Sequence, residues 1–317
     1  MRAIVLNEKG GPEVLRVHEV PDPTPGPEEV VVEVAATALN RADVLQRMGF
    51  YPQPGPAPEH EIPGLELAGR VAERGERAVR WNVGDEVMAI VSGGGYAEKV
   101  VVHERQLMPV PGSVGLPDAA AIPEVFLTAW DALVVQGGLT SGRLALIHAG
   151  ASGVGTAGIQ IAKALGAFVA ITASAGKLDA CRALGADITI DRAGDWGIND
   201  VDVVLDVVGG EYLERNLACL RTKGTIVQVG TMAGGNPTLN FGLLMMRRAR
   251  LIGTVLRARP LEEKIALSQR FTQEVVPLFD TGALSPVIDS RYALDDAPEA
   301  HRRMESNETI GKVLLTV

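Results

Sequence analysis

The amino-acid sequence predicts an α/β protein of two domains, a small β-rich barrel and a doubly wound parallel sheet. Three observations lead to this prediction. The chain has 317 residues, which is more than one ordinary hydrophobic core accommodates. Its first third contains short apolar stretches separated by glycine and proline. Beyond residue 118, strand-like and helix-like stretches alternate.

The barrel is predicted from short β-type runs that turn residues interrupt. A glycine–proline turn at 10–12 and a proline-rich segment at 21–27 separate the first of them. A short helix is expected from Asn40 to Met48, followed at 51–58 by a proline-rich loop that is too rigid for a helix. The predicted strands are 3–6, 14–17, 30–34, 67–73, 86–91 and 97–102.

The parallel sheet is predicted from six apolar runs with helical patterns between them. We expect the strand order 3-2-1-4-5-6. Segment 191–200, between the third and fourth runs, lacks a helical pattern, but it extends to about 30 Å and has to cross only about 15 Å. The predicted strands are 144–148, 168–172, 188–190, 201–208, 225–229 and 251–256.

The C-terminal part is expected to return to the barrel. A long helix is predicted at 262–280, a second at 297–305, and a closing strand at 311–317. The barrel domain is therefore predicted to comprise 1–122 with 266–317, and the parallel-sheet domain to comprise 123–265.

The turn after the first strand of the parallel sheet has the composition of an anion-binding site. Gly150 and Gly155 occupy the first and third positions of the dinucleotide pattern G-x-G-x-x-G, and Ser152 occupies the middle one. A strand, a glycine turn and a helix start bring backbone N–H groups and the positive end of a helix dipole together. The segment predicts a phosphate contact, with a turn that binds nothing as the alternative. The predicted contacts are Ala149, Gly150, Ser152, Gly153, Val154 and Gly155.

Composition argues against several classes of protein. The formal net charge of −9 disfavours a nucleic-acid or anionic-membrane surface. No apolar run approaches the roughly 18 residues that span a bilayer, and the N-terminus lacks the layout of a signal peptide. Cys181 and Cys219 are too few for a disulfide framework or a four-cysteine zinc site. We therefore expect a soluble, cytoplasmic protein.

Several motifs together resemble one family. They are 38–43 (ALNRAD), 63–66 (PGLE), 93–97 (GGGYA), 120–123 (AAIP), 128–130 (TAW) and 148–155 (HAGASGVG). Over essentially its whole length the chain resembles the zinc-free quinone oxidoreductase (zeta-crystallin-like) branch of the medium-chain dehydrogenase/reductases. The resemblance implies a GroES-like catalytic domain and a Rossmann domain, with NADPH in the cleft between them. It also implies a homodimer through the edge strand 251–256, because an open edge invites pairing.

Residue chemistry argues against a metal. Zinc-dependent relatives carry cysteine and histidine where this sequence has Asn40 and Leu65. Leucine cannot ligate zinc, and an asparagine amide is a poor zinc ligand. His60, between Glu59 and Glu61, fits a solvated loop better than a metal site. We predict no metal.

The end of the second parallel strand favours NADPH over NADH. NAD-binding folds place an acidic residue there to hold the ribose hydroxyls. This sequence instead has Ser174 and Lys177, which can donate to a phosphate, and Arg192 follows the third strand. Arg192 stands where many relatives have a tyrosine, and the turn before Lys177 is one residue shorter than in most relatives. Two ordinary surface cations are the alternative.

Without a metal, a quinone or conjugated enone is the expected hydride acceptor, because its reduction gives a delocalised anion. Tyr51 is the candidate for contacting the acceptor oxygen, or it packs on its own prolines. Asn40 is predicted near the nicotinamide, with capping of its helix as the alternative. Thr128 lies on a helix that relatives direct at the nicotinamide, although its hydroxyl also suits a bond to its own helix. None is an obvious proton donor, so water is expected to supply the proton.

Further cofactor contacts follow from the resemblance and from the strand ends, because α/β proteins bind ligands at the carboxyl ends of parallel strands. They are Val208, Gly230, Thr231, Met232, Leu256 and Arg257, with Asn307 and Lys312 near the C-terminus. Together they predict a cofactor that lies along one edge of the sheet.

Three functions stay open. The favoured one is an NADPH-dependent quinone oxidoreductase. The alternative within the enzymes is an NADPH-dependent reductase of α,β-unsaturated carbonyls or enoyl thioesters. The third is a crystallin-like protein of low turnover that binds NADPH or RNA, although the acidic balance weighs against RNA.

Overall fold

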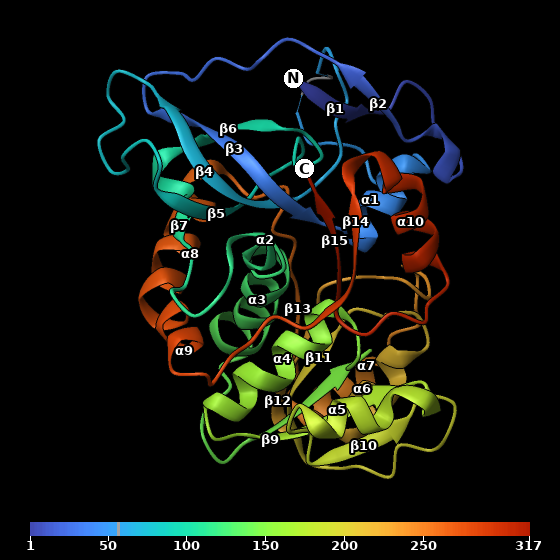
Figure 1. The fold of residues 1–317 in the computed structure, drawn as a ribbon. Helices are drawn as coiled ribbons and strands as arrows, with labels where there is room; N and C mark the ends of the chain where they lie inside the picture. Colours follow the sequence, from blue (N-terminus) through green and yellow to red (C-terminus); the bar gives the residue numbers. More distant parts are fainter. Residues whose placement is uncertain (56–57) are drawn as a thin grey trace. The chain divides into compact units, whose positions relative to one another are not determined.

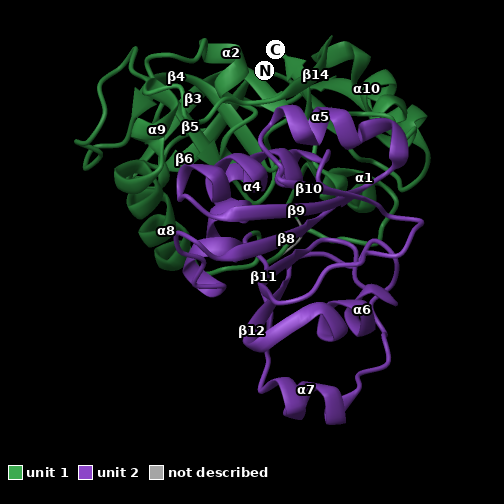
Figure 2. Ribbon diagram, turned by 90° about the horizontal axis from the view of Figure 1, so that it is seen from below, with its two compact units in different colours: residues 1–124, 257–317 green, residues 125–256 purple. Residues whose placement is uncertain are grey.

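The computed structural model describes residues 1–55 and 58–317 (Figure 1). Residues 56 and 57, which belong to the predicted proline-rich loop, lie outside the described residues. The chain divides into two compact units (Figure 2). Unit 1 comprises 1–124 with 257–317, and unit 2 comprises 125–256. The divisions predicted from the sequence lie after residues 122 and 265.

Unit 1 is built on antiparallel strands. The small sheet pairs β1 (Arg2–Val5) with β2 (Arg16–Glu19), and the large sheet has the order β14-β15-β3-β4-β5-β7, with β6 also paired to β3. β15 runs antiparallel to β3, which confirms that the C-terminal tail returns to the barrel. The strands of the large sheet are β3 (Glu29–Ala38), β4 (Glu66–Arg74), β5 (Glu86–Ile90), β6 (Lys99–His103), β7 (Met108–Pro109), β14 (Ile288–Ala293) and β15 (Lys312–Thr316).

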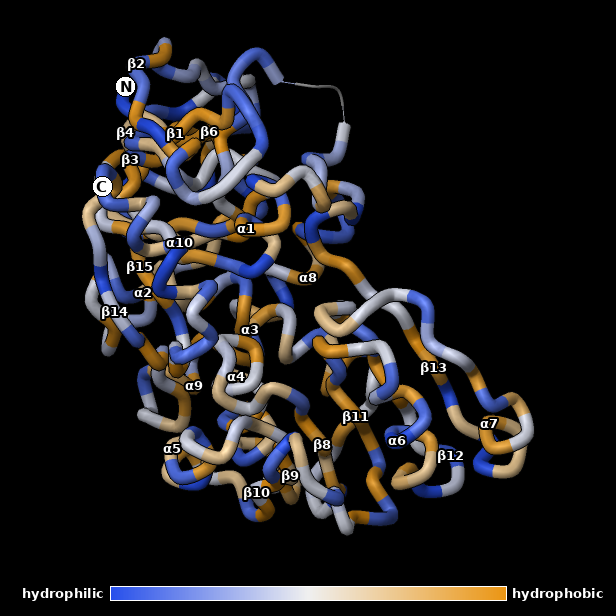
Figure 3. The backbone as a smooth tube through the Cα atoms, turned by 90° about the vertical axis from the view of Figure 1, so that its right-hand side faces the viewer, coloured by the Kyte–Doolittle hydropathy of each residue, from blue (hydrophilic) through white to orange (hydrophobic). Residues whose placement is uncertain are grey.

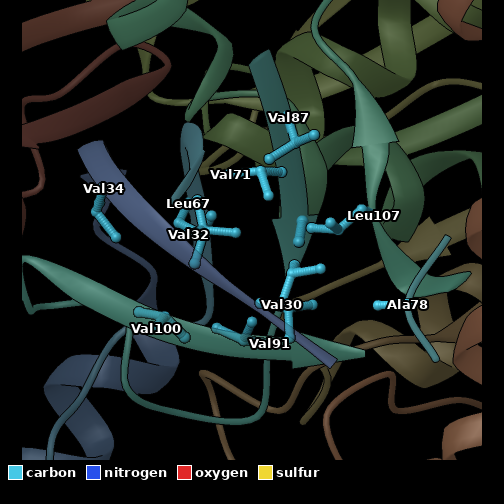
Figure 4. Packing of buried hydrophobic residues seen from close by; sticks show 12 residues of the cluster. Val30, Val32, Val34, Leu67, Val71, Ala78, Val87, Val91, Val100 and Leu107 are labelled. Carbon is cyan, nitrogen blue, oxygen red and sulfur yellow. The ribbon is translucent and has the colours of Figure 1, made fainter. Parts of the chain in front are cut away.

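The core of the barrel follows from alternation along its strands. Val30, Val32 and Val34 of β3 lie two residues apart and therefore point to the same side of the sheet. They pack against Leu67 of β4, Val87 of β5 and their neighbours, as Figure 4 shows. This apolar interior holds the strands whose ends carry the polar residues described below.

The helices of unit 1 are α1 (Arg41–Arg47), α2 (Leu116–Ala119), α8 (Leu261–Glu274), α9 (Val276–Asp280) and α10 (Ala297–Glu305). Three sequence predictions were wrong here. The helix expected at 262–280 breaks at Val275, because Pro277 in the first turn of α9 has no N–H to continue a helix. The run at 14–17 is split between a 3₁₀ turn, η1 (Pro12–Val14), and β2, and β14 was not foreseen.

Unit 2 is a six-stranded parallel sheet with the order β10-β9-β8-β11-β12-β13. This is the predicted order 3-2-1-4-5-6, and 191–200 connects β10 to β11 without a helix, as expected. Figure 3 shows the apolar character of buried strands such as β11. The strands are β8 (Leu144–His148), β9 (Phe168–Ala173), β10 (Ile188–Asp191), β11 (Val201–Asp206), β12 (Leu220–Gln228) and β13 (Arg250–Gly253).

The predicted strand 251–256 is too long at its C-terminal end. β13 ends at Gly253, because β12 ends at Gln228, whose carbonyl takes the last ladder bond from the Thr254 N–H. The helices are α3 (Pro123–Trp130), a π-helical continuation η3 (Asp131–Gln136), α4 (Gly153–Ala164), α5 (Leu178–Ala183), α6 (Tyr212–Cys219) and α7 (Phe241–Arg247). Among the helices that the structure describes, none combines the length and apolar character that crossing a membrane requires.

Candidate active site

The glycine turn after β8 has the geometry of an anion site. Ser152 caps α4, and its Oγ accepts a hydrogen bond from the Gly155 N–H at 3.0 Å. The N–H groups of Gly153 and Val154, at the first two positions of α4, have no acceptor within the helix. A Cβ at Gly155 would lie 2.3 Å from the Ala149 carbonyl oxygen, so only glycine allows this approach of helix and strand. The turn therefore fits a pyrophosphate at the N-terminus of α4.

The predicted phosphate donors gather at one corner of the same edge. The Arg192 N–H donates to the Ala173 carbonyl at 2.8 Å, which places Arg192 next to Ser174 at the end of β9. Lys177 lies one turn further, partly buried, while the Arg192 side chain is exposed. The carboxylate of Asp191 is paired with this strand end, and its Oδ1 accepts from the Ala193 N–H at 3.1 Å. Among the described residues of this corner, two cations thus stand beside one carboxylate that is held by its own turn.

The loops after β11 and β12 lie at the same edge, because all strands of this sheet are parallel. Asp206 fixes the first loop, since its Oδ1 accepts from the N–H groups of Val208 at 2.6 Å and Gly209 at 2.9 Å. Beyond these strands lies a hollow of about 240 Å³ that Gln228 and Thr231 help to line. Gly230 is partly exposed, Thr231 and Met232 are exposed, and Leu256 is buried.

In unit 1, Asn40 is held by a buried network at the start of α1. Its Nδ2 donates to Glu66 Oε1 at 2.9 Å and to the Ala38 carbonyl at 3.1 Å. Its Oδ1 accepts from Lys312 Nζ at 2.8 Å, and the same ammonium pairs with Glu66 Oε1 at 2.8 Å. Lys312 and Glu66 are 4% and 0% exposed. The ammonium that was predicted to close over the cofactor is therefore engaged inside unit 1, where it fixes the Asn40 amide.

Asp43 extends this network into the barrel. Its carboxylate accepts from the N–H groups of Asn40 at 2.8 Å and Gly64 at 3.2 Å, and from the Tyr96 hydroxyl at 3.2 Å. Burial nevertheless raises the pKa of Asp43 to about 6. The Tyr96 hydroxyl lies 3.3 Å from His301 Nε2, and burial followed by the charge of Arg47 lowers the pKa of His301 to about 3. Asp43 therefore orders α1 and the Gly64 turn.

Tyr51 and Arg257 form a second group in unit 1. The Arg257 guanidinium lies over the Tyr51 ring, 5.2 Å from its centroid. It donates to the Ser92 carbonyl at 2.8 Å and to Gln46 Oε1 at 2.7 Å. Burial raises the pKa of the Tyr51 hydroxyl, and the Arg257 charge acts against that rise. Arg257, predicted to touch the cofactor, thus fixes the loop that carries Tyr51.

The remaining predicted residues have contrasting environments. Thr128 is buried, and its Oγ1 has no hydrogen-bond partner among the described residues. A buried hydroxyl without a partner is unfavourable unless a ligand or water satisfies it. Asn307 is exposed and accepts from Arg41 Nη2 at 2.7 Å.

Sequence reasoning did not single out Gln46 and Glu66 of these networks, nor Glu124, whose backbone N–H donates to Glu66 Oε2 at 2.8 Å. Glu124 is the only charged residue between Asp118 and Asp131, and Glu66 begins an apolar strand. A lone charged residue in an apolar run is a signal that could have identified Glu66 and Glu124. Gln46 gave no such signal, because a helical glutamine is ordinary.

Comparison with known proteins decides the family. A family model for the alcohol dehydrogenase GroES-like domain matches 26–112, and a model described as zinc-binding dehydrogenase matches 184–315. The quinone oxidoreductase of Pseudomonas aeruginosa is 33% identical over 325 residues, which cover 96% of each chain. The chain belongs to the medium-chain dehydrogenase/reductase superfamily. Unit 1 is accordingly GroES-like and unit 2 Rossmann-like.

Two further relatives of this dehydrogenase/reductase bear on its ligands. The crystal structure of Escherichia coli quinone oxidoreductase in complex with NADPH superposes with a TM-score of 0.89 at 28% identity, over 100% of both chains. The polyketide synthase GfsB of Streptomyces halstedii is 34% identical over 302 residues, 91% of this chain. The chain spans 5% of the length of that synthase. These likenesses support a nicotinamide cofactor and leave the acceptor undecided.

The zinc-binding description does not match this chain's residues at the two positions discussed above. Leu65 is buried and aliphatic, and the Asn40 amide is engaged by Glu66 and Lys312. Within 1–55 and 58–317, no group of three or more His, Cys, Asp or Glu side chains is arranged to hold a metal ion.

Proposed function

We propose that the chain is an NADPH-dependent quinone oxidoreductase that transfers hydride without zinc. The observation that carries the choice of NADPH is the corner at the end of β9. Ser174, Lys177 and Arg192 lie there, and β9 itself is followed by Ser174 where an NAD-binding fold has an acidic residue that holds the ribose and repels a phosphate. The NADPH complex of the Escherichia coli relative supports the same choice.

Each group of residues has a task in this proposal. The bound nicotinamide supplies the hydride. The N–H groups of Gly153 and Val154 would hold the pyrophosphate, and the Thr128 hydroxyl, which has no hydrogen-bond partner among the described residues, would hold the nicotinamide. Tyr51, held under Arg257, contacts the acceptor oxygen. The chain's contribution is mainly orientation and exclusion of water.

A second candidate function is reduction of enoyl thioesters or other α,β-unsaturated carbonyls. The polyketide synthase likeness favours it, since the matched segment of GfsB is as similar to this chain as the quinone oxidoreductases are. Both reactions begin with hydride transfer to a conjugated acceptor, so the same residues serve either.

Acceptor kinetics separates the two functions. With NADPH fixed, kcat/KM is measured for 1,4-benzoquinone, a simple enone and a crotonyl thioester. The proposal predicts the highest value for the quinone. A thioester at least tenfold better would transfer the assignment to the second function, and no turnover of any acceptor would refute both.

We also propose a homodimer through the edge of unit 2. β13 pairs with β12 on one side and with no other described strand. Large apolar side chains are exposed around it: Phe241, Met245, Met246, Leu251 and Val255. Light scattering of the purified protein is expected to give twice the chain mass, and Leu251→Lys to shift it toward the monomer. A monomeric wild type would refute the dimer.

A further inference from the structure

Glu124 occupies an unusual position at the start of α3. Its backbone N–H donates to Glu66 Oε2 at 2.8 Å. The other oxygen of Glu66 is taken by Asn40 Nδ2 and Lys312 Nζ. The Glu66 carboxylate is thus fully occupied, and it anchors Glu124 at the edge of the buried network that fixes Asn40.

The carboxyl group of Glu124 differs in its hydrogen bonding from four other carboxyl groups of unit 1. Asp43, Glu61, Glu66 and Glu305 each accept hydrogen bonds from described donors. The Glu124 carboxyl group makes no hydrogen bond or ion pair with any residue in the described ranges. An unpaired charge in a poorly solvated place is costly, so the neutral acid is favoured.

The surrounding charges agree with a neutral acid. Burial, and then the Glu66 carboxylate, raise the pKa of Glu124 to about 8, although the side chain keeps part of its surface accessible. The charged and titratable groups that interact electrostatically with the Glu124 carboxyl group are Glu66 of β4, Asp43 of α1, Lys312 of β15, Arg257, Tyr51 and Lys264 of α8. At neutral pH the protonated form of Glu124 is therefore favoured, and no acceptor among the described residues holds its proton.

Two observations relate the Glu124 proton to the residues proposed to contact the nicotinamide and the acceptor. Thr128 follows Glu124 by one helical turn and lies on the same face of α3, and its buried Oγ1 has no hydrogen-bond partner within 1–55 and 58–317. Burial and, as a further cause, the Glu124 charge raise the pKa of the hydroxyl of Tyr51, the candidate for contacting the acceptor oxygen. One face of α3 thus carries two polar groups, the Glu124 carboxyl and the Thr128 hydroxyl, that the described part of the chain leaves unsatisfied.

We propose that Glu124 donates the proton that completes reduction of the acceptor, an inference that rests on the reductase function proposed above. Hydride adds two electrons to the acceptor and leaves it as an anion. The O–H bond of Glu124 breaks, and a new O–H bond forms on the reduced quinone, or a new C–H bond on an enolate. The resulting carboxylate recovers its proton from water at its accessible side, which restores the neutral acid.

The first test is kinetic and uses Glu124→Gln, which keeps the shape and loses the acid. Its kcat/KM for the acceptor should fall about 100-fold, the usual contribution of a general acid. Loss of rate above about pH 8 in the wild type should disappear in the variant. The affinity for NADPH, measured by fluorescence, should not change. Glu263→Gln, an exposed carboxylate on α8, is the matched control and should behave as wild type.

The second test needs no turnover. Infrared titration of the ligand-free wild type should show a protonated carboxyl band at pH 7 that disappears with a midpoint near pH 8. Glu124→Gln should lack it, and Glu124→Asp, which serves if the glutamine variant does not fold, should shift its midpoint. Absence of the band at pH 7, or a wild-type rate and pH profile in Glu124→Gln, would overturn the proton-donor role alone. A wild type that shows the band but reduces no acceptor would instead refute the reductase function, and with it the role of Glu124.

Discussion

The two units build their polar sites in opposite ways. In unit 2, the anion site at 149–155 consists of consecutive residues, and backbone N–H groups do the binding. In unit 1, the network around Asn40 consists of buried side chains far apart in sequence, since Asn40 and Lys312 are separated by 272 positions. A local site depends on turn geometry, whereas a long-range site depends on each buried charge keeping its partner. This difference predicts where each unit is most sensitive to substitution.

The largest effect is expected from Lys312→Met. It leaves the Glu66 carboxylate buried without its cation, which should lower the free energy of unfolding by about 3–5 kcal/mol. Urea denaturation measures the loss. Adding Glu66→Gln should recover part of it, because the stranded charge is then removed.

The control for that prediction lies in unit 2. Lys163 pairs with Asp187 at 2.9 Å, but both side chains are 35% exposed. Lys163→Met should therefore cost less than about 1 kcal/mol. Equal losses for Lys163→Met and Lys312→Met would show that the buried network of unit 1 has no special importance.

Gly155→Ala tests the local site of unit 2. The added Cβ would lie 2.3 Å from the Ala149 carbonyl oxygen, so the turn must move at a cost of about 1–3 kcal/mol. NADPH binding, measured by calorimetry, should weaken more than tenfold. At Gly176 a Cβ would meet nothing within 4 Å, so Gly176→Ala should leave both stability and binding unchanged. Wild-type NADPH affinity in Gly155→Ala would exclude this turn from the cofactor site.

A smaller effect is expected at the cation corner of unit 2. Lys177→Ala and Arg192→Ala each remove one charge, and each should weaken NADPH binding about tenfold, or about 1.4 kcal/mol. NADH binding should not change, because NADH lacks the phosphate. Arg182→Ala, which removes an exposed cation of α5, serves as the control. Equal loss of NADPH and NADH affinity would assign these residues a structural role.

The last effect concerns pH and unit 1. The pKa of Glu124 is raised in the folded protein to about 8, so its contribution to stability is complete below the ordinary glutamate range and is lost as pH rises through about 8. The free energy of unfolding should fall from pH 5 to 8, by less than about 1.4 kcal/mol per pH unit, the limit for one proton. Urea titrations of Glu124→Gln should show a flatter profile. An identical profile in wild type and variant would place the ionisation elsewhere.

The sequence was informative where structure depends on near neighbours. The run at 144–148, the turn with Gly150 and Gly155, and the alternation of strands and helices predicted the parallel sheet and its order. The break at Val275 was missed, although Pro277 was visible, because a proline in the first turn of a new helix looks like one inside a longer helix. β14 was missed because its residues, Ile288–Ala293, are only partly buried and lack a strong alternation.

The candidate site was predictable only in part for the same reason. Asn40, Tyr51 and Lys312 were chosen from motifs, but the contact of Lys312 with Asn40 and Glu66 arises because β15 pairs with β3. The role of Arg257 as a support for Tyr51 likewise depends on residues about 165 to 206 positions away. Pattern and spacing along one chain do not encode such pairings.

The most direct test of the account is the choice of hydride donor by metal-depleted enzyme. The kcat/KM for NADPH and for NADH is measured with 1,4-benzoquinone after exhaustive treatment with a chelator. The account predicts that NADPH is at least about tenfold better and that chelation leaves its rate unchanged. Preference for NADH, or loss of activity on chelation that added zinc restores, would contradict it.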